Sequence, residues 1–251
     1  MEKDQYRELF EAEDSHWWFT GQRALALNLL SRRFRGGRIL DAGCGTGGNT
    51  AALARLGRVT GIDLSREALE FSRQRGLAGL GLARLESLPF KGSSFDLVTC
   101  FGVLYHRQAD DARAFQEFSR VLKPDGLLLL TTPAMKFLRW GPFRTPHDDL
   151  QHTGRRHSRR DLESLCALSG LVPEKISYYT TLLSPLIILA RLLVNLHHAL
   201  GGTAGSELGM PSGPVNRLLE RTLGLEKNLL RRMDLPFGVG LVCLARKGSS
   251  S

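Results

Sequence analysis

Cysteine is scarce in this 251-residue sequence, and the few cysteines stand far apart. The four are Cys44, Cys100, Cys166 and Cys243, and no two of them have the C-x-x-C spacing of a zinc site or a redox motif. Small secreted domains that depend on disulfides are much richer in cysteine. The sequence therefore indicates neither a disulfide framework nor a metal site, and it favours a reduced, cytoplasmic setting.

Long hydrophobic runs are also absent. No stretch reaches the roughly 20 apolar residues that a membrane-spanning helix needs. The first five residues, 1–5, are acidic and polar, so they do not resemble a secretory signal. We therefore expect a cytoplasmic protein. Its 42% hydrophobic content is enough to bury a sizeable core as one domain with additions.

Acidic residues are in the minority, with 25 Asp and Glu against 34 Lys and Arg, so the formal net charge is +9. Much of the basic charge is arginine, clustered at Arg32, Arg33, Arg35 and Arg38, at Arg155, Arg156, Arg159 and Arg160, and at Arg231 and Arg232. Such clusters fit an anionic small molecule or lipid headgroup, or simply solvated helix faces. No nucleic-acid-binding motif accompanies them, so nucleic acid is not an expected partner.

One glycine-rich turn organises the rest of the sequence. A short apolar stretch, 38–40, leads into Asp41, then into alternate glycines, and then into a helix-like segment, 49–56. This order of strand, turn and helix is typical of a nucleotide-binding α/β unit. Because glycine has no Cβ atom, a ligand can lie directly against the backbone of the turn. We therefore predict a cofactor with an adenosine-like body here.

Two cofactors fit the turn. Gly43, Gly45 and Gly48 match the G-x-G-x-x-G pattern of dinucleotide sites, whereas Gly43, Gly45 and Gly47 match an acidic-x-G-x-G-x-G pattern. Asp63, at the end of the next strand-like run, suits a ribose and is compatible with both. A carboxylate at Asp41 favours a cationic cofactor over a pyrophosphate, unless Asp41 only closes the turn.

Strands and helices alternate after the turn. The sequence predicts strands at 59–63, 80–84, 95–101, 127–132 and 171–179, and helices at 65–75 and 109–122. Such alternation is typical of a parallel sheet with helices on both faces. The ligand of such a sheet binds at the carboxyl ends of the strands.

Six short segments carry a family resemblance. They are DAGCGTG at 41–47, GIDLS at 61–65, ESLPF at 86–90, FDLV at 95–98, VLYH at 103–106 and FSRVLKPDG at 118–126. As a set, over roughly residues 15–180, the sequence resembles the class I S-adenosylmethionine-dependent methyltransferases. The resemblance implies a Rossmann-like α/β fold, with a seven-stranded, mostly parallel sheet whose last strand, expected at 239–246, is antiparallel. It also implies S-adenosyl-L-methionine as the cofactor.

The resemblance further implies the cofactor-binding residues. The turn residues Asp41, Gly43, Cys44, Gly45 and Gly47 would cradle the methionine part, and the carbonyls of Cys100 and Phe101 would receive its ammonium group. Asp63 would hold the ribose, Leu64 would pack on adenine, and the backbone of Leu85 and Glu86 would meet the adenine edge. The family often has an acidic residue where this sequence has Arg84. Trp18 and Arg23 would close the site, with Arg23 placed to reach the methionine carboxylate.

The N-terminal segment, 1–35, is expected to form a helical cap. Three adjacent aromatic residues, 17–19, follow His16, and they cannot all share one helix face. At least one should therefore point toward a neighbouring element or a ligand. The segment either packs on the sheet as a structural cap or acts as a lid that excludes water from the cofactor.

A basic loop, 133–160, lies beyond the common core. Ser158 can cap a helix that starts at Arg159 and Arg160. Cations are not favoured at a helix start, so this loop either binds a phosphate or carboxylate or merely exposes its arginines.

About sixty residues, 181–236, intervene before the last strand. They contain an apolar helix near 182–200, a link at 201–213 and a second helix at 214–232. The two helices either pack on each other as a hairpin or form a substrate lid, a dimer face or a membrane-surface contact. The predicted organisation is thus a cap at 1–35, a cofactor-binding core at 36–180, the insertion at 181–236, the last strand at 237–247 and a tail at 248–251.

The predicted function is methyl transfer to a small-molecule acceptor: a lipid-linked compound, a sugar or a secondary metabolite, and at oxygen rather than at nitrogen or carbon. If the acceptor is a hydroxyl, its proton needs a base. His106 is the first candidate, His152 and His157 are alternatives, and Tyr178 or Tyr179 can orient the acceptor. Two other functions stay open: a nucleic-acid or protein methyltransferase, and a non-catalytic S-adenosylmethionine-binding protein.

Overall fold

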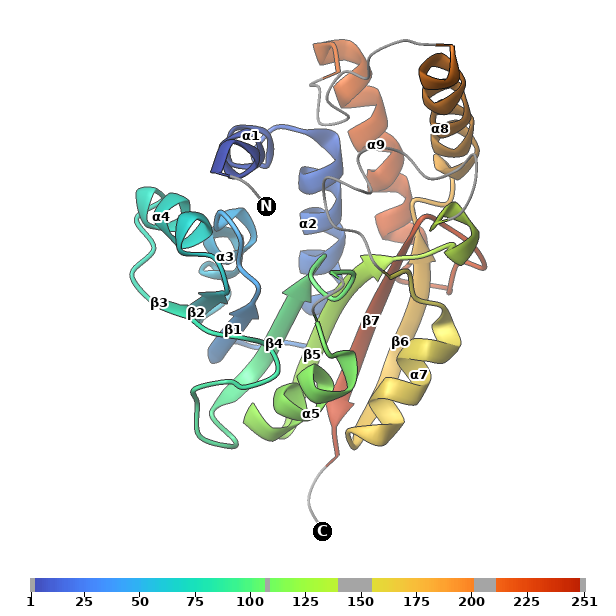
Figure 1. Cartoon of the computed structure of the whole chain (residues 1–251). Coiled ribbons are helices and arrows are strands. Elements are labelled where there is room, and N and C mark those ends of the chain that lie inside the picture. Colours follow the sequence, from blue (N-terminus) through green and yellow to red (C-terminus); the bar gives the residue numbers. More distant parts are fainter. Residues whose placement is uncertain (1–2, 107–108, 140–154, 201–210, 249–251) are drawn as a thin grey trace.

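A computed structural model describes residues 3–106, 109–139, 155–200 and 211–248. Its centre is a seven-stranded sheet in the order β3-β2-β1-β4-β5-β7-β6. The strands are β1 (Arg38–Ala42), β2 (Arg58–Asp63), β3 (Leu80–Leu82), β4 (Phe95–Phe101), β5 (Leu122–Pro133), β6 (Leu171–Tyr179) and β7 (Gly240–Lys247). Only β7 runs antiparallel to its two neighbours within this sheet. The predicted Rossmann-like sheet with an antiparallel last strand is confirmed (Figure 1).

Helices cover both faces of the sheet, as predicted. On one face α5 (Asp111–Val121) and α7 (Arg159–Leu168) bury residues such as Phe115 and Leu162 against the central strands. On the other face, α2 (Trp17–Leu30) and α3 (Gly48–Leu53) pack with the end of α9 (Gly213–Leu229). The sheet is therefore packed between two apolar layers, one on each face. The carboxyl ends of the strands are not covered by these layers, and the candidate site lies there.

Local sequence signals set most element boundaries. The hydroxyl of Ser65 accepts a hydrogen bond from the Ala68 amide and starts α4 (Arg66–Gln74), as predicted. Ser158 and Asp161 form a capping box at the start of α7. The strand expected at 127–132 is longer because Leu122 already pairs with Phe95 ahead of a register shift. The strand expected at 80–84 is shorter and ends at Leu82.

The N-terminal helices lie in two different places. Helix α2 packs directly on the sheet and buries Leu25, Leu29 and Leu30 there. Helix α1 (Lys3–Ala12) instead lies against α4, where the Phe10 and Phe71 rings are 5.2 Å apart. In Figure 1 α1 crosses the end of the molecule at which β1 and β2 finish.

The late helices do not pack mainly on each other. Helix α9 lies along α2: Asn216 accepts a hydrogen bond from the Trp17 amide, and Leu223 fills the space above Gly21. Helix α8 (Ser184–Ala199) stands outside α9 at the edge of the molecule (Figure 1). The contacts of α9 therefore favour packing on α2, through the buried Leu223, over the predicted hairpin of 181–236. Within the described ranges, no helix has the length and hydrophobicity to cross a bilayer.

Candidate active site

The glycine turn lies where β1, β2 and β4 end side by side. The amides of Gly43 and Cys44 both donate to the carbonyl of Ile62, each at 2.8 Å, and so fix the turn to β2. Gly43, Gly45 and Gly47 have φ values of 81°, 56° and 91°, a region that favours glycine. A Cβ atom on Gly45 would meet nothing within 4 Å. The turn therefore offers open backbone to a ligand, as the sequence predicts.

Asp63 stands directly beside the turn, at the end of β2. Its Oδ2 accepts a hydrogen bond from the Gly45 amide at 2.9 Å, and its Oδ1 accepts one from the Ser65 amide at 2.9 Å. Burial raises the pKa of this carboxyl, and the backbone hydrogen bonds oppose the rise. Leu64, the next residue, is exposed. An acceptor group and an apolar surface thus lie next to each other, which suits a ribose and a purine base.

Asp41 lies beneath the turn rather than on its surface. Only 1% of it is exposed, and its two oxygens accept hydrogen bonds from Thr99 at 2.8 Å and from Thr50 at 2.6 Å. Burial raises the pKa of Asp41 to about 6, and the two hydroxyl bonds limit the rise. Asp41 therefore ties β1, β4 and α3 together.

The remaining core positions of the predicted cofactor site differ in exposure. Cys44 and Cys100 are buried, and burial raises the pKa of both thiols, so neither is a reactive thiolate. Leu85 is also buried, and Phe101 is half-buried at the end of β4. Glu86 accepts a hydrogen bond from the Asp110 amide at 3.0 Å and pairs with Arg84 at 3.4 Å, so its side chain is engaged within the protein.

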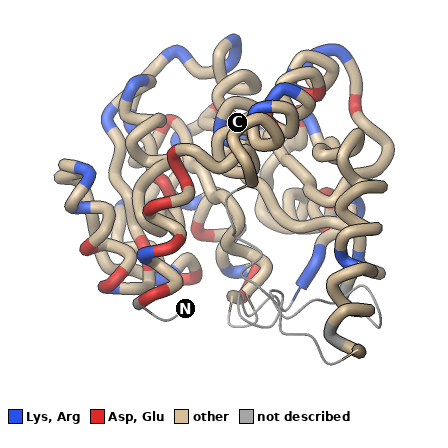
Figure 2. The backbone as a smooth tube through the Cα atoms, turned by 90° about the horizontal axis from the view of Figure 1, so that it is seen from above, with Lys and Arg blue, Asp and Glu red and all other residues tan. Residues whose placement is uncertain are grey.

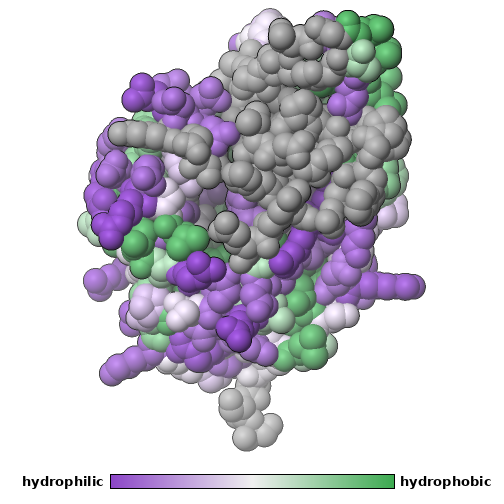
Figure 3. Space-filling view, viewed as in Figure 1, coloured by the Kyte–Doolittle hydropathy of each residue, from purple (hydrophilic) through white to green (hydrophobic). Residues whose placement is uncertain are grey.

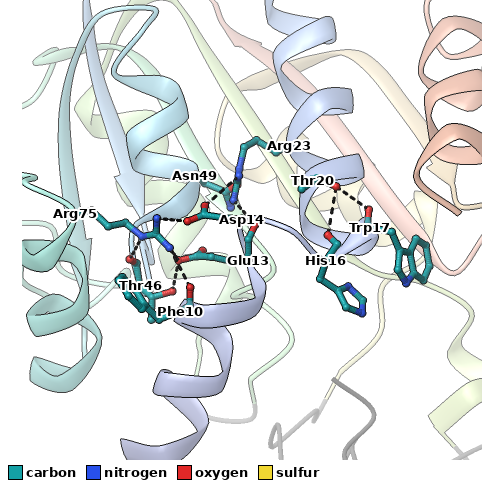
Figure 4. Close-up of polar contacts among 10 residues, drawn as sticks. All are labelled: Phe10, Glu13, Asp14, His16, Trp17, Thr20, Arg23, Thr46, Asn49 and Arg75. Carbon is teal, nitrogen blue, oxygen red and sulfur yellow. Dashed lines mark hydrogen bonds and ion pairs between the residues drawn. The ribbon is translucent and has the colours of Figure 1, made fainter. Parts of the chain in front are cut away.

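An ionic cluster joins the N-terminal segment to the glycine turn (Figure 4). Glu13 is buried and accepts hydrogen bonds from Thr46 at 2.5 Å and from Arg75 at 2.9 Å. Arg75 also donates to the Thr46 carbonyl at 2.9 Å and pairs with Asp14 at 2.6 Å. Burial raises the pKa of Glu13, while Thr46, Arg75 and Arg23 oppose the rise. The cluster fixes the segment after α1 against the turn.

Sequence reasoning missed Glu13 and Arg75. The two residues are 62 positions apart, and Arg75 ends a helix whose exposed face carries other arginines. The signal available was the adjacent acidic pair of Glu13 and Asp14 directly before the aromatic segment. That pair does not reveal its partner, because nothing local places Arg75 beside it.

Arg23 and Trp18, the two predicted closing residues, both lie on α2. Arg23 donates to Asn49 at 3.2 Å and to the Glu13 carbonyl at 2.9 Å, so it lies at the start of α3 beside the turn (Figure 4). Trp18 packs near Tyr179, with ring centroids 6.3 Å apart. The tyrosine is buried, and burial raises its pKa. The two closing residues thus lie above different parts of the sheet, Arg23 by the turn and Trp18 by the end of β6.

The three candidate histidines have different surroundings. His106 follows β4 and is half-buried, with its ring 4.3 Å from that of Tyr105. It belongs to the same segment as Val103, whose side chain lies against Gly43 of the turn. His157 is only 5% exposed, and its ring nitrogens lie 2.8 Å from Thr132 and 3.1 Å from Asp111. His152 lies outside the described residues. Of the two described histidines, His106 lies three residues beyond Val103, which contacts the turn, and His157 is packed between β5 and α5.

Residues 40–130 match the model of the methyltransferase domain family. The chain carries a class I S-adenosylmethionine-dependent methyltransferase domain. S-adenosyl-L-methionine is therefore the cofactor of this domain.

Curated relatives carry the same domain. The chain is 38% identical over 156 residues to the malonyl-[acyl-carrier protein] O-methyltransferase of Enterobacter lignolyticus, covering 59% of this chain and 58% of that protein. It is 33% identical over 145 residues to the ubiquinone biosynthesis O-methyltransferase of Haemophilus ducreyi, covering 49% and 61%. The chain therefore spans about three fifths of the length of these relatives.

Solved structures show the same fold. The geranyl diphosphate C-methyltransferase of Streptomyces coelicolor A3(2), in complex with Mg²⁺, geranyl diphosphate and S-adenosyl-L-homocysteine, superposes with a TM-score of 0.58 and 18% identity. The superposition covers 90% of this chain and 80% of that one. At this level of identity the likeness concerns the fold alone.

Proposed function

We propose that this protein transfers the methyl group of S-adenosyl-L-methionine to a hydroxyl of an apolar or lipid-linked small molecule. One observation carries the proposal. The space above Gly45 is open, and the Gly45 amide nitrogen lies 2.9 Å from the carboxylate of Asp63. A carboxylate at this distance from a glycine turn is placed to accept hydrogen bonds from ribose hydroxyls. The matching domain at 40–130 supports the same cofactor.

The proposed cofactor site uses the remaining predicted residues as follows. In this proposal the turn from Gly43 to Gly47 contacts the methionine part of the cofactor. Arg23 of α2, which contacts Asn49 at the start of α3, binds the methionine carboxylate. Leu64 supplies an apolar surface for adenine. Because Leu85 is buried and Glu86 is engaged with Asp110 and Arg84, we propose only backbone contacts for these two.

The residues before α2 form the proposed cover of this site. Tyr6 lies beside Ser65 and Asp63, and Arg75 anchors the following segment through Glu13 and Asp14. This places α1 over the end of β2, where the ribose is expected. We therefore propose that 1–35 serves as a lid as well as a structural cap, and that 181–236 completes the acceptor side.

The chemistry asked of the protein is limited. When bound, S-adenosyl-L-methionine supplies a methyl group already activated by its sulfonium. The protein must hold the acceptor oxygen in line, exclude water and accept the hydroxyl proton. We propose His106 for the proton because it follows β4, whose end meets the turn.

The acceptor class is supported by the relatives and by the late helices. Two relatives are named as O-methyltransferases, one of ubiquinone biosynthesis and one of malonyl-[acyl-carrier protein], and a structural neighbour is named as a geranyl diphosphate C-methyltransferase. All three names contain an apolar or carrier-linked compound, and two of them specify oxygen. The exposed leucines of α8 are consistent with an apolar acceptor.

Methyl transfer from labelled S-adenosyl-L-methionine tests the proposal, with lipid-soluble and water-soluble cell extracts as acceptors. We expect label in the lipid-soluble products, and we expect His106→Ala to lower the turnover about 100-fold without weakening cofactor binding. Gln116→Ala, on the exposed surface of α5, is the control and should retain full turnover. Unchanged turnover in His106→Ala rejects the base, and label only in water-soluble products rejects the acceptor class.

A further inference from the structure

Helix α8 and the residues beside it expose one continuous line of leucine. Six leucines at alternating spacings of four and three residues are between 52% and 79% exposed: Leu182, Leu186, Leu189, Leu193, Leu196 and Leu200. Residues spaced in this way share one face of a helix. Figure 3 shows hydrophobic side chains along the outer edge of the molecule, at the position of α8.

Three polar residues of α8, at 184, 191 and 195, lie on its opposite side, while His197 is exposed beside the leucines. Ser184 is buried, and Arg191 and Asn195 are half-buried. A helix on the surface of a water-soluble protein has the reverse pattern, with apolar residues toward the core and polar residues toward water. A contiguous exposed apolar surface of this kind marks a site of contact with another protein or with a membrane.

Helix α9 also exposes apolar residues along one face. Val215, Leu218, Leu225 and Leu229 are all exposed and again share one helix face. Arg217 and Arg221 are exposed, one turn apart, on the flank of this apolar face. Arginine beside exposed leucine is the arrangement of helices that lie in a membrane interface, because the guanidinium reaches the headgroups while the leucine enters the acyl region.

The charge of this surface is positive. Within 211–233 the exposed basic residues are Arg217, Arg221, Arg231 and Arg232, and the one exposed acidic residue is Glu220. Glu226 is buried, with its Oε1 on the Leu182 amide at 2.7 Å. Anionic lipid headgroups complement such a surface.

We infer that α8 and the exposed face of α9 dock on the surface of an anionic lipid bilayer. With 16 residues, α8 is roughly 24 Å long, less than the roughly 30 Å of a hydrocarbon core, so the helix lies on the bilayer instead of crossing it. This surface exists whether or not the methyl group goes to a lipid, so the inference does not depend on the proposed acceptor.

A second copy of the chain is a poorer occupant. Helices that pair through a leucine line carry charged residues beside that line, which set the partner and its direction. The positions beside the leucines of α8 are instead Leu183, Pro185, Ala190, Leu192, His197 and Ala199, and α8 contains no Asp or Glu. The apolar face is therefore broad and uncharged, which suits lipid better than a paired helix.

Docking would bring the active site toward the lipid. Helix α8 starts four residues after Thr180, directly beyond the carboxyl end of β6, at the edge of the sheet where the glycine turn and Trp18 also lie. Bilayer contact along α8 thus sets this edge beside the membrane surface.

Vesicle flotation tests the inference on the full chain. We expect the protein to float with vesicles of phosphatidylcholine and phosphatidylglycerol and to bind pure phosphatidylcholine less. Leu189→Ser combined with Leu193→Ser should reduce the bound fraction about tenfold or more, since two exposed leucines leave the bilayer. The control is Leu168→Ser on α7, a leucine that is also exposed and lies far from α8. Equal flotation of both variants, or no flotation of the unmodified chain, overturns the inference.

A fluorescence measurement keeps the test independent of variant stability. A polarity-sensitive dye on Leu193→Cys should shift to the blue on addition of the mixed vesicles, whereas the same dye on Leu168→Cys should not. The four native cysteines are buried, so labelling is confined to the new position. A blue shift that arises from protein concentration alone, with a dimer seen in sedimentation velocity, would contradict lipid docking and assign the face to a second copy.

Discussion

Asp41 shows how one residue serves both the fold and the site. Two threonine hydroxyls, from α3 and β4, satisfy its carboxylate, and the residue is buried below the glycine turn. Its proposed role in cofactor binding is therefore electrostatic and does not need direct contact. A negative charge in a buried position is felt strongly because little water screens it.

The affinity for S-adenosyl-L-methionine should therefore depend on pH through Asp41. Burial raises the pKa of Asp41 to about 6, so below pH 6 the folded protein holds this carboxyl protonated and neutral. The cationic cofactor favours the ionised form. We expect the affinity to rise with pH up to about 6 and then level off, with about tenfold weaker binding one unit below the pKa.

Calorimetric titrations from pH 5 to 8 measure this dependence. Asp41→Asn keeps the size of the side chain and removes its ionisation, so it should bind more weakly at pH 7 and lose most of the pH dependence. An identical pH profile in both proteins would show that Asp41 only shapes the turn.

For single residues, the sequence predicted those site residues whose positions depend only on neighbouring elements. Asp41, the glycines and Asp63 occur at spacings fixed by a strand, a turn and the next strand, so their proximity follows from the topology. The pairing of Glu13 with Arg75 does not follow, because it depends on how α1 is placed across α4. His157 was predicted as a candidate base from its residue type, and its two buried partners could not be inferred without the packing of β5 on α5.

Among the elements, α1 is held to the core largely by one side chain. Arg75 donates to the Phe10 carbonyl, the Thr46 carbonyl and Glu13, pairs with Asp14 and covers the Phe10 ring at 4.5 Å. Its removal would leave Glu13 without its nearest cation in a buried position, which is costly.

We therefore expect Arg75→Ala to release α1 while the sheet stays folded. Hydrogen exchange of amides in residues 3–16 should become at least about tenfold faster, equivalent to about 1.4 kcal/mol of local stability. Arg73→Ala removes an exposed arginine from the same helix and should leave exchange unchanged. If both variants exchange alike, Arg75 does not hold the proposed lid.

The order and type of most helices and strands could be predicted from the sequence. Which elements pack against each other was harder to predict. The apolar patterns along the sequence predict β1 to β5 and the helices between them, because each pattern has the period of a strand or of a helix with one buried face. The apolar stripe of α9 predicts a buried face, yet it does not say that the face meets α2 at Gly21. Glycine at that position is needed because Leu223 occupies the space of a side chain, a constraint that appears only in three dimensions.

On the scale of the whole molecule, the two proposed functional surfaces meet at one edge. The glycine turn, Asp63 and α1 form the proposed cofactor side, while α8 and α9 add an apolar, basic surface beyond β6. Figure 2 shows the distribution of charged residues from above. The parallel strands explain this arrangement, since all their carboxyl ends lie at that edge. The cofactor side could be recognised from the sequence, whereas the outward orientation of the leucines on α8 required the structure.

Calorimetric titration with S-adenosyl-L-methionine tests the central claim most directly. Gly45 and Gly76 both have positive φ, at 56° and 75°, and a Cβ atom on either meets nothing within 4 Å. Alanine at either position should therefore strain the backbone similarly, but only Gly45→Ala fills the space above the turn. We predict one cofactor per chain for the unmodified protein and for Gly76→Ala, and at least about tenfold weaker binding for Gly45→Ala. Failure of the unmodified protein to bind the cofactor, or equal binding by both variants, would contradict the account.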